Sequence, residues 1–351
     1  MSKNICIVAG ARPNFVKVAP LIRAIKKSEE AKYYLVYAGK KEDPTLEPSL
    51  FDDLQMPAPD FFLGVDSTKL NEITSMVMAE FDHFLDEYPV DVVIVVDDLA
   101  STMAAAIVTK KRGVKLAHLV AGTRSFDINM PKEINRLVID ALSDYLFTAG
   151  VKSNSIATRE QAETSQTYMV GNILMDTLRF NHDRLRKPAF ADGVKGRYIV
   201  FTLNRRALLA DENNLYRMMD AILAAADDMT VIAPLRGKSR EMLERYNDKI
   251  LITEPLSYLE FGWLAANAAG IITDSGNVAE EATFNGVPCI TLNNYTEHQE
   301  TVSVGSNVLV GEDADKLREA VGQMVKGEWK KCALPDRWDG RTAERIVQIL
   351  L

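Results

Sequence analysis

The sequence predicts two α/β domains, each built on a doubly wound parallel β-sheet. With 351 residues, the chain exceeds the usual size of one hydrophobic core, so two domains of about 150 residues each are expected. Short apolar runs alternate with segments of helical periodicity along most of the chain, which is typical of repeated βαβ units. The run Val92–Val96 is continuously apolar, as expected for a strand buried on both faces of a parallel sheet.

The first domain is expected over residues 1–170. Helices are predicted over 16–27, 70–87 and 101–111, because apolar residues recur there with a helical period. Strands are predicted at the apolar runs Ile5–Ala9, Tyr34–Tyr37, Val90–Val96, Lys115–Leu119 and Tyr145–Thr148.

A second series of strands predicts a second domain over residues 171–340. It begins with a predicted helix over 172–186 and a polar stretch around 188–196, and the final segment 341–351 is expected to be a helix that completes the first domain. Ligands of doubly wound sheets bind beyond the carboxyl ends of the strands, so we expect an interdomain cleft that joins both sets of strand-end loops. The strands are predicted at Tyr198–Thr202, Thr230–Ala233, Ile250–Ile252, Gly270–Thr273 and Cys289–Leu292.

The composition argues against several classes of protein. Hydrophobic residues make up 47% of the chain and charged residues 26%, which is ordinary for a soluble globular protein. The net charge of −8 argues against nucleic acid as a partner, because nucleic-acid binders carry a basic face. The chain passes from residue 4 directly into a predicted strand, which leaves no room for a secretory signal, and no apolar run is long enough for a membrane span. A cytoplasmic protein is therefore predicted.

The three cysteines, Cys6, Cys289 and Cys332, have neither metal-ligand nor redox spacing. They are predicted to be reduced core residues. The sequence contains no evident metal-binding motif, so neither a metal nor another cofactor is expected.

The first candidate site is the turn Gly10–Asn14, between the first predicted strand and its helix. A glycine turn at a strand end can bring backbone N–H groups and a helix N-terminus to a phosphate. Arg12 and Lys17 would supply counter-charges. The alternative is an ordinary strand-to-helix turn with a solvated arginine.

The second candidate site is the segment Thr273–Glu281, again a strand, a turn and a helix. Ser275 and Gly276 are small residues at the helix start that would let a diphosphate approach backbone donors. Glu281, farther along the helix, could accept both hydroxyls of a ribose. The alternative is that Asp274 or Ser275 caps the helix and that the glutamates only decorate its first turns.

The third candidate site is the pair Asp97 and Asp98, at the end of a predicted central strand. Adjacent carboxylates repel each other and can raise the pKa of one of them, which suits a general acid or base. Helix capping by one aspartate is the alternative. Arg205 and Arg206, at the end of another strand, could neutralise a leaving diphosphate or lie in a solvated loop.

In order and spacing, these segments resemble the family of non-hydrolysing UDP-N-acetylglucosamine 2-epimerases. The resemblance covers most of the chain, and this many ordered matches are hard to produce by accident. The matching motifs are Gly10–Pro13, Ala121–Arg124, Pro131–Arg136, Val170–Asn172, Glu254–Leu256 with Tyr258 and Phe261, Thr273–Glu281, and Thr296–Glu297 with Glu300, Gly305 and Asn307.

The resemblance implies a glycosyltransferase-B-like fold of two Rossmann-like domains, usually in a dimer, with UDP held mainly by the second domain. The family eliminates UDP from the sugar to form a glycal and re-adds it after inversion at C2, which requires positioned acids, bases and cations. The resemblance implies that Asp98 transfers the C2 proton and that Arg205 or Arg206 faces the leaving diphosphate. The implied contacts with UDP are Arg12 and Lys17 near the phosphates, Ser275 and Gly276 at the diphosphate, Glu281 at the ribose and Phe261 near the uracil.

Some positions depart from the family pattern. Val120 and Lys132 stand where the family has glutamates, Asn204 where it has a histidine, and His298 where it has an arginine. Candidate substitutes for the lost groups are Asp97, Glu133 and His298. The His-rich regulatory turn of the family reads 233–236 here without a histidine, so activation by substrate at a second site is not expected.

The primary hypothesis is an isomerase that binds a UDP-N-acetylhexosamine and interconverts its gluco and manno epimers for surface-polysaccharide synthesis. One alternative is a catalytically silent UDP-sugar-binding pseudoenzyme that regulates an active paralogue. Another is a divergent enzyme acting on a different UDP-sugar, with Asp97, Asp98 and Lys132 forming a new site. The expected partners are UDP-N-acetylhexosamine or UDP, and either a second copy of the chain or a paralogue.

Overall fold

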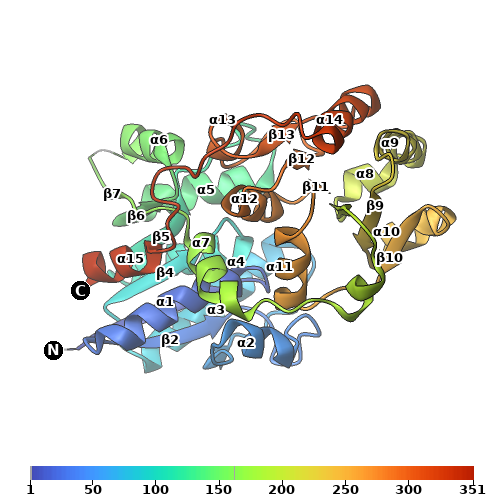
Figure 1. The fold of residues 1–351 in the computed structure, drawn as a ribbon. Coiled ribbons are helices and arrows are strands. Elements are labelled where there is room, and N and C mark those ends of the chain that lie inside the picture. Colours follow the sequence, from blue (N-terminus) through green and yellow to red (C-terminus); the bar gives the residue numbers. More distant parts are fainter. Residues whose placement is uncertain (1, 162) are drawn as a thin grey trace. The chain divides into compact units, whose positions relative to one another are not determined.

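The computed structural model describes residues 2–161 and 163–351, and the chain divides into two compact units. Unit 1 comprises Met1–Phe180 and Asp336–Leu351, and unit 2 comprises Asn181–Pro335. Each unit contains one parallel sheet with helices packed against it (Figure 1). The predicted fold class is confirmed.

The sheet of unit 1 has seven parallel strands in the order β3-β2-β1-β4-β5-β6-β7. The predicted strands are all present, and the structure adds the short strands β3 and β7 at the two edges. Side chains of β4 are fully or almost fully buried along its whole length, as its continuous apolar run predicts. The strands are β1 (Lys3–Ala9), β2 (Ala31–Tyr37), β3 (Phe61–Phe62), β4 (Val92–Val96), β5 (Lys115–Ala121), β6 (Tyr145–Thr148) and β7 (Gln166–Met169).

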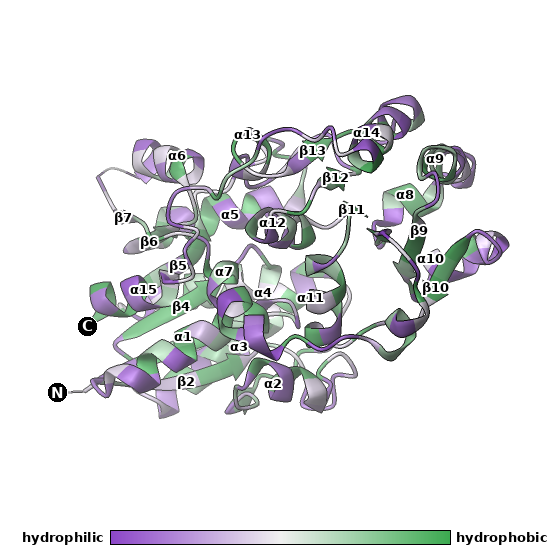
Figure 2. Ribbon diagram, in the orientation of Figure 1, coloured by the Kyte–Doolittle hydropathy of each residue, from purple (hydrophilic) through white to green (hydrophobic). Residues whose placement is uncertain are grey.

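The helices of unit 1 carry apolar residues on the side that faces the sheet and polar residues on the other. The hydropathy colouring of Figure 2 shows this division, with β4 green between helices that are partly purple. The helices are α1 (Asn14–Ser28), α2 (Pro48–Leu54), α3 (Leu70–Glu87), α4 (Ala100–Lys111), α5 (Pro131–Leu142), α6 (Val151–Gln161), α7 (Ile173–Asn181) and α15 (Thr342–Leu350).

Helix α15 belongs to unit 1 although it follows unit 2 in the sequence. It packs against α1, and the carboxylate of Asp176 caps its start by accepting hydrogen bonds from the backbone N–H groups of Thr342 (3.0 Å) and Ala343 (2.8 Å). Just before α15, the buried Trp338 donates its indole N–H to the carbonyl of Ala149 (3.0 Å). Burial raises the pKa of Asp176 to about 6.

Unit 2 has a six-stranded parallel sheet in the order β10-β9-β8-β11-β12-β13. The predicted strands are confirmed, and β13 was missed. The strands are β8 (Tyr198–Phe201), β9 (Thr230–Pro234), β10 (Ile250–Thr253), β11 (Gly270–Thr273), β12 (Cys289–Thr291) and β13 (Asn307–Leu309). The α-helices are α8 (Arg206–Ala210), α9 (Glu212–Ala225), α10 (Gly237–Leu243), α11 (Tyr258–Ala266), α12 (Gly276–Asn285), α13 (Glu300–Ser303) and α14 (Ala314–Lys326), and short 3₁₀ turns lie at His182–Arg184, Ala189–Gly193 and Glu244–Tyr246.

Both sheets have a topological switch point, where the strand order reverses. It lies between β1 and β4 in unit 1 and between β8 and β11 in unit 2. Ligands of doubly wound sheets bind outside the carboxyl ends of the strands at such points. The segments that follow these four strands carry most of the candidate site residues predicted from the sequence, whereas Phe261, Glu133 and His298 follow other strands.

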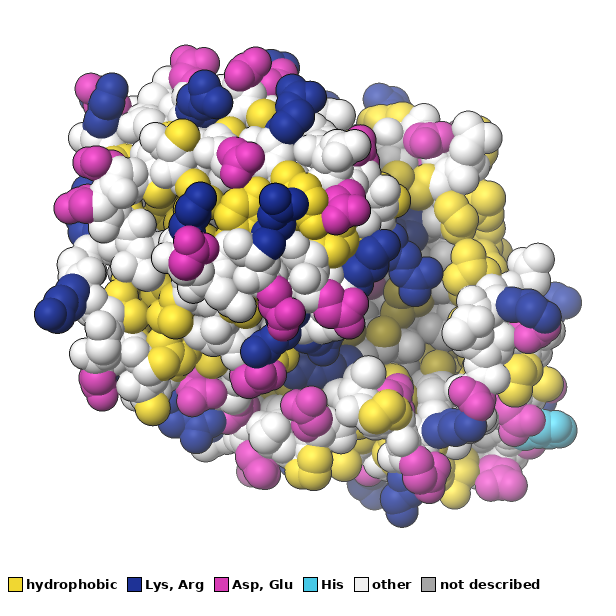
Figure 3. Space-filling model, turned by 90° about the vertical axis from the view of Figure 1, so that its right-hand side faces the viewer, with side chains coloured by type: hydrophobic (Ala, Val, Ile, Leu, Met, Phe, Trp, Pro, Cys, Tyr) yellow, Lys and Arg dark blue, Asp and Glu magenta, His cyan; other side chains and the backbone are white. Residues whose placement is uncertain are grey.

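Basic and acidic side chains are interspersed on the face shown in Figure 3. None of the described helices is both long enough and apolar enough to cross a bilayer.

Cys6 and Cys289 are buried, as predicted, whereas Cys332 is exposed. The prediction for Cys332 is wrong because this residue lies in an irregular segment after α14, outside the sheet and its helices.

Candidate functional site

The turn after β1 is closed by its own asparagine. The side-chain oxygen of Asn14 accepts hydrogen bonds from the backbone N–H groups of Gly10 (2.8 Å) and Ala11 (3.1 Å). These are the donors that a phosphate was expected to use, so the backbone part of the predicted anion site is already occupied. Arg12 remains partly exposed at this turn as a counter-charge.

Lys17 and Asp97 form a partly buried ion pair at the switch point of unit 1. The Lys17 ammonium nitrogen lies 2.6 Å from Asp97 Oδ1, and the side-chain amide of Asn14 donates to Asp97 Oδ2 (2.8 Å). Asp97 has a left-handed backbone with φ of 59°, which turns the chain sharply after β4. Lys17, predicted to approach a phosphate, is therefore already paired with a carboxylate inside unit 1.

Asp98 lies in a cationic environment. Arg136 places two guanidinium nitrogens 2.6 and 2.8 Å from Asp98 Oδ2, and the Lys132 ammonium lies 3.4 Å from Oδ1. Although burial alone would raise it, Lys132 and Arg136 hold the pKa of Asp98 below its ordinary value. The expectation that charge repulsion raises a pKa in this pair is thus wrong for Asp98, because the nearest charges are positive.

Glu133 holds the loop that follows β5. Its carboxylate accepts hydrogen bonds from the backbone N–H groups of Ser125 (2.8 Å) and Phe126 (3.0 Å) and from the Ser125 hydroxyl (2.9 Å), and it lies 3.1 Å from the Arg136 guanidinium. The residue is only 2% exposed. These contacts account for Glu133 without a role in proton transfer.

A buried network of charges lies beneath this loop. The Asp140 carboxylate contacts His118 Nδ1 (2.5 Å), an Arg124 guanidinium nitrogen (2.7 Å) and the backbone N–H of Gly122 (3.1 Å). Arg124 also lies 2.7 Å from the Glu160 carboxylate. The network joins β5, α5 and α6 and fixes the course of the chain between Val120 and α5.

Val120 adopts a backbone conformation that a β-branched residue rarely tolerates. Its φ is 73°, and the pairing of β5 with β6 shifts register between Leu119 and Ala121. A valine there costs about 1–3 kcal/mol in backbone strain, whereas asparagine tolerates left-handed geometry better. This is the position at which the resemblance implies a glutamate.

Replacing Val120 by asparagine is therefore expected to stabilise unit 1 by about 1 kcal/mol. The measurement is the midpoint of thermal unfolding followed by circular dichroism. Val95→Asn, on the buried central strand, is the control and should destabilise strongly. A lower midpoint for Val120→Asn would mean that the packing of the valine outweighs its backbone strain.

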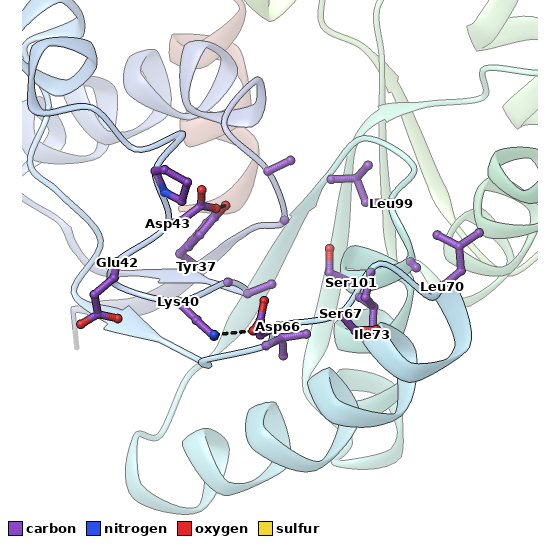
Figure 4. A pocket seen from close by; sticks show the side chains of 17 residues that line it. Tyr37, Lys40, Glu42, Asp43, Asp66, Ser67, Leu70, Ile73, Leu99 and Ser101 are labelled. Atoms are coloured by element: carbon purple, nitrogen blue, oxygen red, sulfur yellow. Dashed lines mark hydrogen bonds and ion pairs between the residues drawn. The ribbon is translucent and has the colours of Figure 1, made fainter. Parts of the chain in front are cut away.

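A cavity of about 580 Å³ opens at the carboxyl ends of β1 and β2. In Figure 4, Lys40 and Asp66 form an ion pair at one side of it, while Leu99 and Leu70 contribute apolar surface. Gly10 lines the cavity and cannot be replaced without movement, because an added Cβ would lie 2.1 Å from the hydroxyl oxygen of Ser101. Unit 1 thus has a mixed polar and apolar hollow directly beside its switch point.

In unit 2, the turn after β11 caps helix α12 and leaves its first residue open. The Ser275 hydroxyl accepts a hydrogen bond from the backbone N–H of Val278 at 3.5 Å, so the predicted capping role is confirmed. A Cβ added to Gly276 would meet nothing within 4 Å. The helix start therefore keeps open space next to backbone donors, which is suitable for an anion.

Glu281 lies in α12 and is 7% exposed. Burial, with a smaller contribution from the neighbouring Glu280, raises its pKa to about 8. Glu280 lies 3.6 Å from the His298 Nε2 atom, and His298 is also buried. Phe261 lies in α11, where its ring packs against the hydrophobic core of unit 2.

The structure separates the roles of the two adjacent arginines after β8. Arg205 donates a hydrogen bond to the side-chain oxygen of Asn293 (2.6 Å), and Asn293 donates to the carbonyl of Asp274 (3.2 Å). Through Asn293, Arg205 is thus linked to the turn that contains Ser275, whereas Arg206 lines a separate cavity near β9.

Among the described residues, no group of His, Cys, Asp and Glu side chains is placed to hold a metal ion.

Two residues important to the site lie in segments singled out from the sequence, but no role was predicted for either. Asn14 orders the turn after β1, and Arg136 binds Asp98. The spacing of Arg136 and Lys132, four residues apart on one helix, puts both on one face, which could have indicated a shared partner. For Asn14 there was no comparable signal, because a single asparagine at a helix start is common.

Comparison with known proteins decides the family. A family model described as UDP-N-acetylglucosamine 2-epimerase matches residues 23–351. The chain belongs to the UDP-N-acetylglucosamine 2-epimerase family. Among its relatives, the UDP-N-acetylglucosamine 2-epimerase of Methanocaldococcus jannaschii is 34% identical, over 99% of this chain and 98% of the relative. The UDP-2,3-diacetamido-2,3-dideoxy-D-glucuronate 2-epimerase of Pseudomonas aeruginosa is 31% identical, over 99% of both chains.

Solved structures of the epimerase family share the architecture of this chain. The M. jannaschii UDP-GlcNAc 2-epimerase in complex with UDP-GlcNAc and UDP superimposes with a TM-score of 0.86 at 34% identity, covering 99% of each chain. A UDP-glucosyltransferase from Polygonum tinctorium, at 13% identity and a TM-score of 0.60, shares the fold alone. The glycosyltransferase-B-like fold predicted from the resemblance is confirmed.

Proposed function

We propose that this chain is an isomerase that inverts C2 of a UDP-N-acetylhexosamine, nominally interconverting UDP-N-acetylglucosamine and its manno epimer. The observation that carries the proposal is the switch point of unit 2. An open helix start at Gly276 lies on the same helix as the buried Glu281, in a chain 34% identical to an epimerase whose structure contains UDP-GlcNAc and UDP.

Unit 2 would hold the UDP moiety. The N–H groups at the start of α12, at Ser275 and Gly276, receive the diphosphate, and Glu281 accepts the ribose hydroxyls. Arg205, which lies on the side of this turn, stabilises the charge of the departing UDP. Phe261 would lie near the uracil, while Arg12 of unit 1 supplies a further positive charge.

Asp98 would move the proton at C2. Because Lys132 and Arg136 keep its carboxyl ionised, it can accept the C2 proton while the C1–O bond breaks and UDP leaves with the bonding electrons. The glycal that results regains UDP at C1 and takes up a proton from the solvent at C2 on the opposite face, while Asp98 returns its proton to the solvent. Lys132, which lies 3.4 Å from Asp98, stabilises the negative charge that develops as UDP departs.

The cellular setting follows from this function. A nucleotide sugar of this kind is a donor for surface-polysaccharide synthesis in the cytoplasm, and we expect the chain to act there as a homodimer or with a paralogue. The P. aeruginosa relative is named for a UDP-sugar whose C6 is a carboxylate, so the identity of the sugar varies within the family.

The test is proton NMR of the purified protein with UDP-N-acetylglucosamine in D₂O, with calorimetric binding of UDP as the control for an intact site. The expected result is deuterium at C2 together with the manno epimer. Tight UDP binding without exchange for any UDP-N-acetylhexosamine would overturn the proposal and favour a catalytically silent UDP-sugar-binding protein.

The affinity for UDP is expected to depend on pH through Glu281. Because the pKa of Glu281 is raised to about 8, its carboxyl group is mostly protonated at pH 7 when no UDP is bound. To accept the ribose hydroxyls, the carboxyl group must lose that proton. Affinity should therefore rise by up to about tenfold between pH 7 and pH 8.5. Calorimetry in buffers of different ionisation enthalpy measures the released proton.

Glu281→Gln is the matched variant for this prediction. It should bind UDP more weakly at pH 8.5 and lose the pH dependence and the proton release. A profile of the unchanged protein that is flat from pH 7 to pH 8.5 would contradict the assignment of Glu281 to the ribose.

A further inference from the structure

A cavity of unit 2, near the Ser275 turn, is cationic. Its volume is about 560 Å³, and Arg206, Arg236 and Lys238 line it. Arg206 begins α8 soon after β8, and the other two cations follow β9. Because β8 and β9 are adjacent parallel strands, the three cations gather at the carboxyl ends of these strands.

These cations lack the acidic partners that neighbouring arginines have. Arg240 lies 2.6 Å from the Glu254 carboxylate, and Arg205 lies 3.8 Å from that of Glu312. Over residues 2–161 and 163–351, no carboxylate lines the cavity, and no ion pair joins any of its three cations to one. Like charges gathered without a counter-charge repel each other, so the cavity is suited to an anionic ligand.

The cavity lies within reach of a sugar attached at the Ser275 turn. The strands β9, β8 and β11 are consecutive in the sheet, and neighbouring strands lie about 4.8 Å apart, which puts the loops after β9 and β11 about 10 Å apart. Asn204, which also lines the cavity, donates its backbone N–H to the Asp274 carboxylate (2.7 Å) next to that turn. The cations thus lie within about 10 Å of a diphosphate bound at Ser275, which is within reach of its sugar.

We propose that Arg206, Arg236 and Lys238 bind a carboxylate on the sugar, and that the substrate is a UDP-2-acetamido-hexuronate in place of a neutral hexosamine. This inference rests on the proposed function, because it requires the diphosphate at the Ser275 turn. The planar guanidinium groups match a carboxylate in bidentate geometry. A neutral primary alcohol at C6 would leave the three positive charges without a partner.

The test compares two ligands that differ only at C6. Calorimetry measures binding of UDP-N-acetylglucosamine and of UDP-N-acetylglucosaminuronate to the full chain, with UDP alone as the reference. The hexuronate is expected to bind about ten- to a hundredfold more tightly than the neutral sugar, because charge-assisted hydrogen bonds are stronger than neutral ones. This preference should fall as the salt concentration rises.

The decisive variant is the double substitution Arg236→Gln with Lys238→Gln. It should reduce the preference for the hexuronate to about twofold or less, because two of the cations that would bind the carboxylate are lost. The affinity for UDP should stay unchanged, because the Ser275 turn is not altered. The matched control is Lys195→Gln with Lys249→Gln, which removes the same charge at exposed positions that precede β8 and β10. These positions lie at the amino ends of the strands, away from the cavity, so the preference for the hexuronate should persist.

The outcomes separate this inference from the proposed function. Equal affinities of the unchanged protein for the two sugars would overturn the inference. Binding of two UDP molecules per chain, with the second lost in the double variant, would also overturn it and make the cavity a second nucleotide site. A hexuronate preference without C2 exchange on either sugar would support the carboxylate site and reject the epimerase function.

Discussion

Replacing Asp98 by asparagine is expected to lower the rate of deuterium exchange at C2 by a factor of about 10²–10⁴, the usual contribution of one proton-transfer group. Asparagine keeps the shape of the side chain and an oxygen for Arg136, but it cannot accept the C2 proton. Calorimetric affinity for UDP should stay within about twofold, because Asp98 is not among the residues assigned to contact UDP. The exchange rate is measured by NMR in D₂O.

The matched control for Asp98→Asn is Asp91→Asn. Asp91 precedes the same strand, β4, and accepts a hydrogen bond from the backbone N–H of Asn4 at the opposite end. Its substitution should leave the exchange rate unchanged. If Asp98→Asn retained full exchange while folding normally, Asp98 would not be the proton-transfer group, and Asp97 would be the next candidate.

Replacing Asp140 by alanine is expected to lower the free energy of unfolding by about 3–5 kcal/mol, because it breaks a buried ion pair and leaves charged partners behind. The carboxylate pairs with Arg124, contacts His118 and accepts a hydrogen bond from the backbone N–H of Gly122, and it has no solvent exposure. Urea denaturation followed by circular dichroism measures the loss. Asp140→Asn should cost less, because the amide oxygen can still accept one of these hydrogen bonds.

Asp82→Ala is the exposed counterpart of this change. Asp82 also pairs with an arginine, Arg112, at 2.6 Å, but its side chain is 48% exposed. Surface pairs contribute about 0–1 kcal/mol, so the two alanine substitutions should differ severalfold in their effect. Equal effects would mean that the Asp140 network is solvated and does not hold unit 1 together.

The sequence was sufficient to predict what the hydrophobic pattern controls. The run Val92–Val96 predicted a central strand, and the helix over Leu70–Glu87 has the bounds expected. The edge strands β3 and β7 were missed because they are short and half-exposed. The fold class therefore followed from the sequence, while the edges of the sheets required the structure.

The chemistry of individual side chains was harder to predict, because it depends on partners far away in the sequence. The pKa of Asp98 is set by Arg136 and Lys132, and Asp97 is held by Lys17. The sequence places Asp97 and Asp98 together but says nothing of the cations around them. The pKa of Asp98 therefore could not be predicted without the fold.

The return of the chain to unit 1 through α15 has a consequence for synthesis on the ribosome. Nascent domains generally fold as they emerge, at about 5–20 residues per second, but the segment Asp336–Leu351 of unit 1 emerges only after all of unit 2. Until then the carbonyl of Ala149 lacks the Trp338 indole, and the carboxylate of Asp176 has no helix to cap. The second half of the protein can thus finish folding first, while the first half stays incomplete until the end of translation.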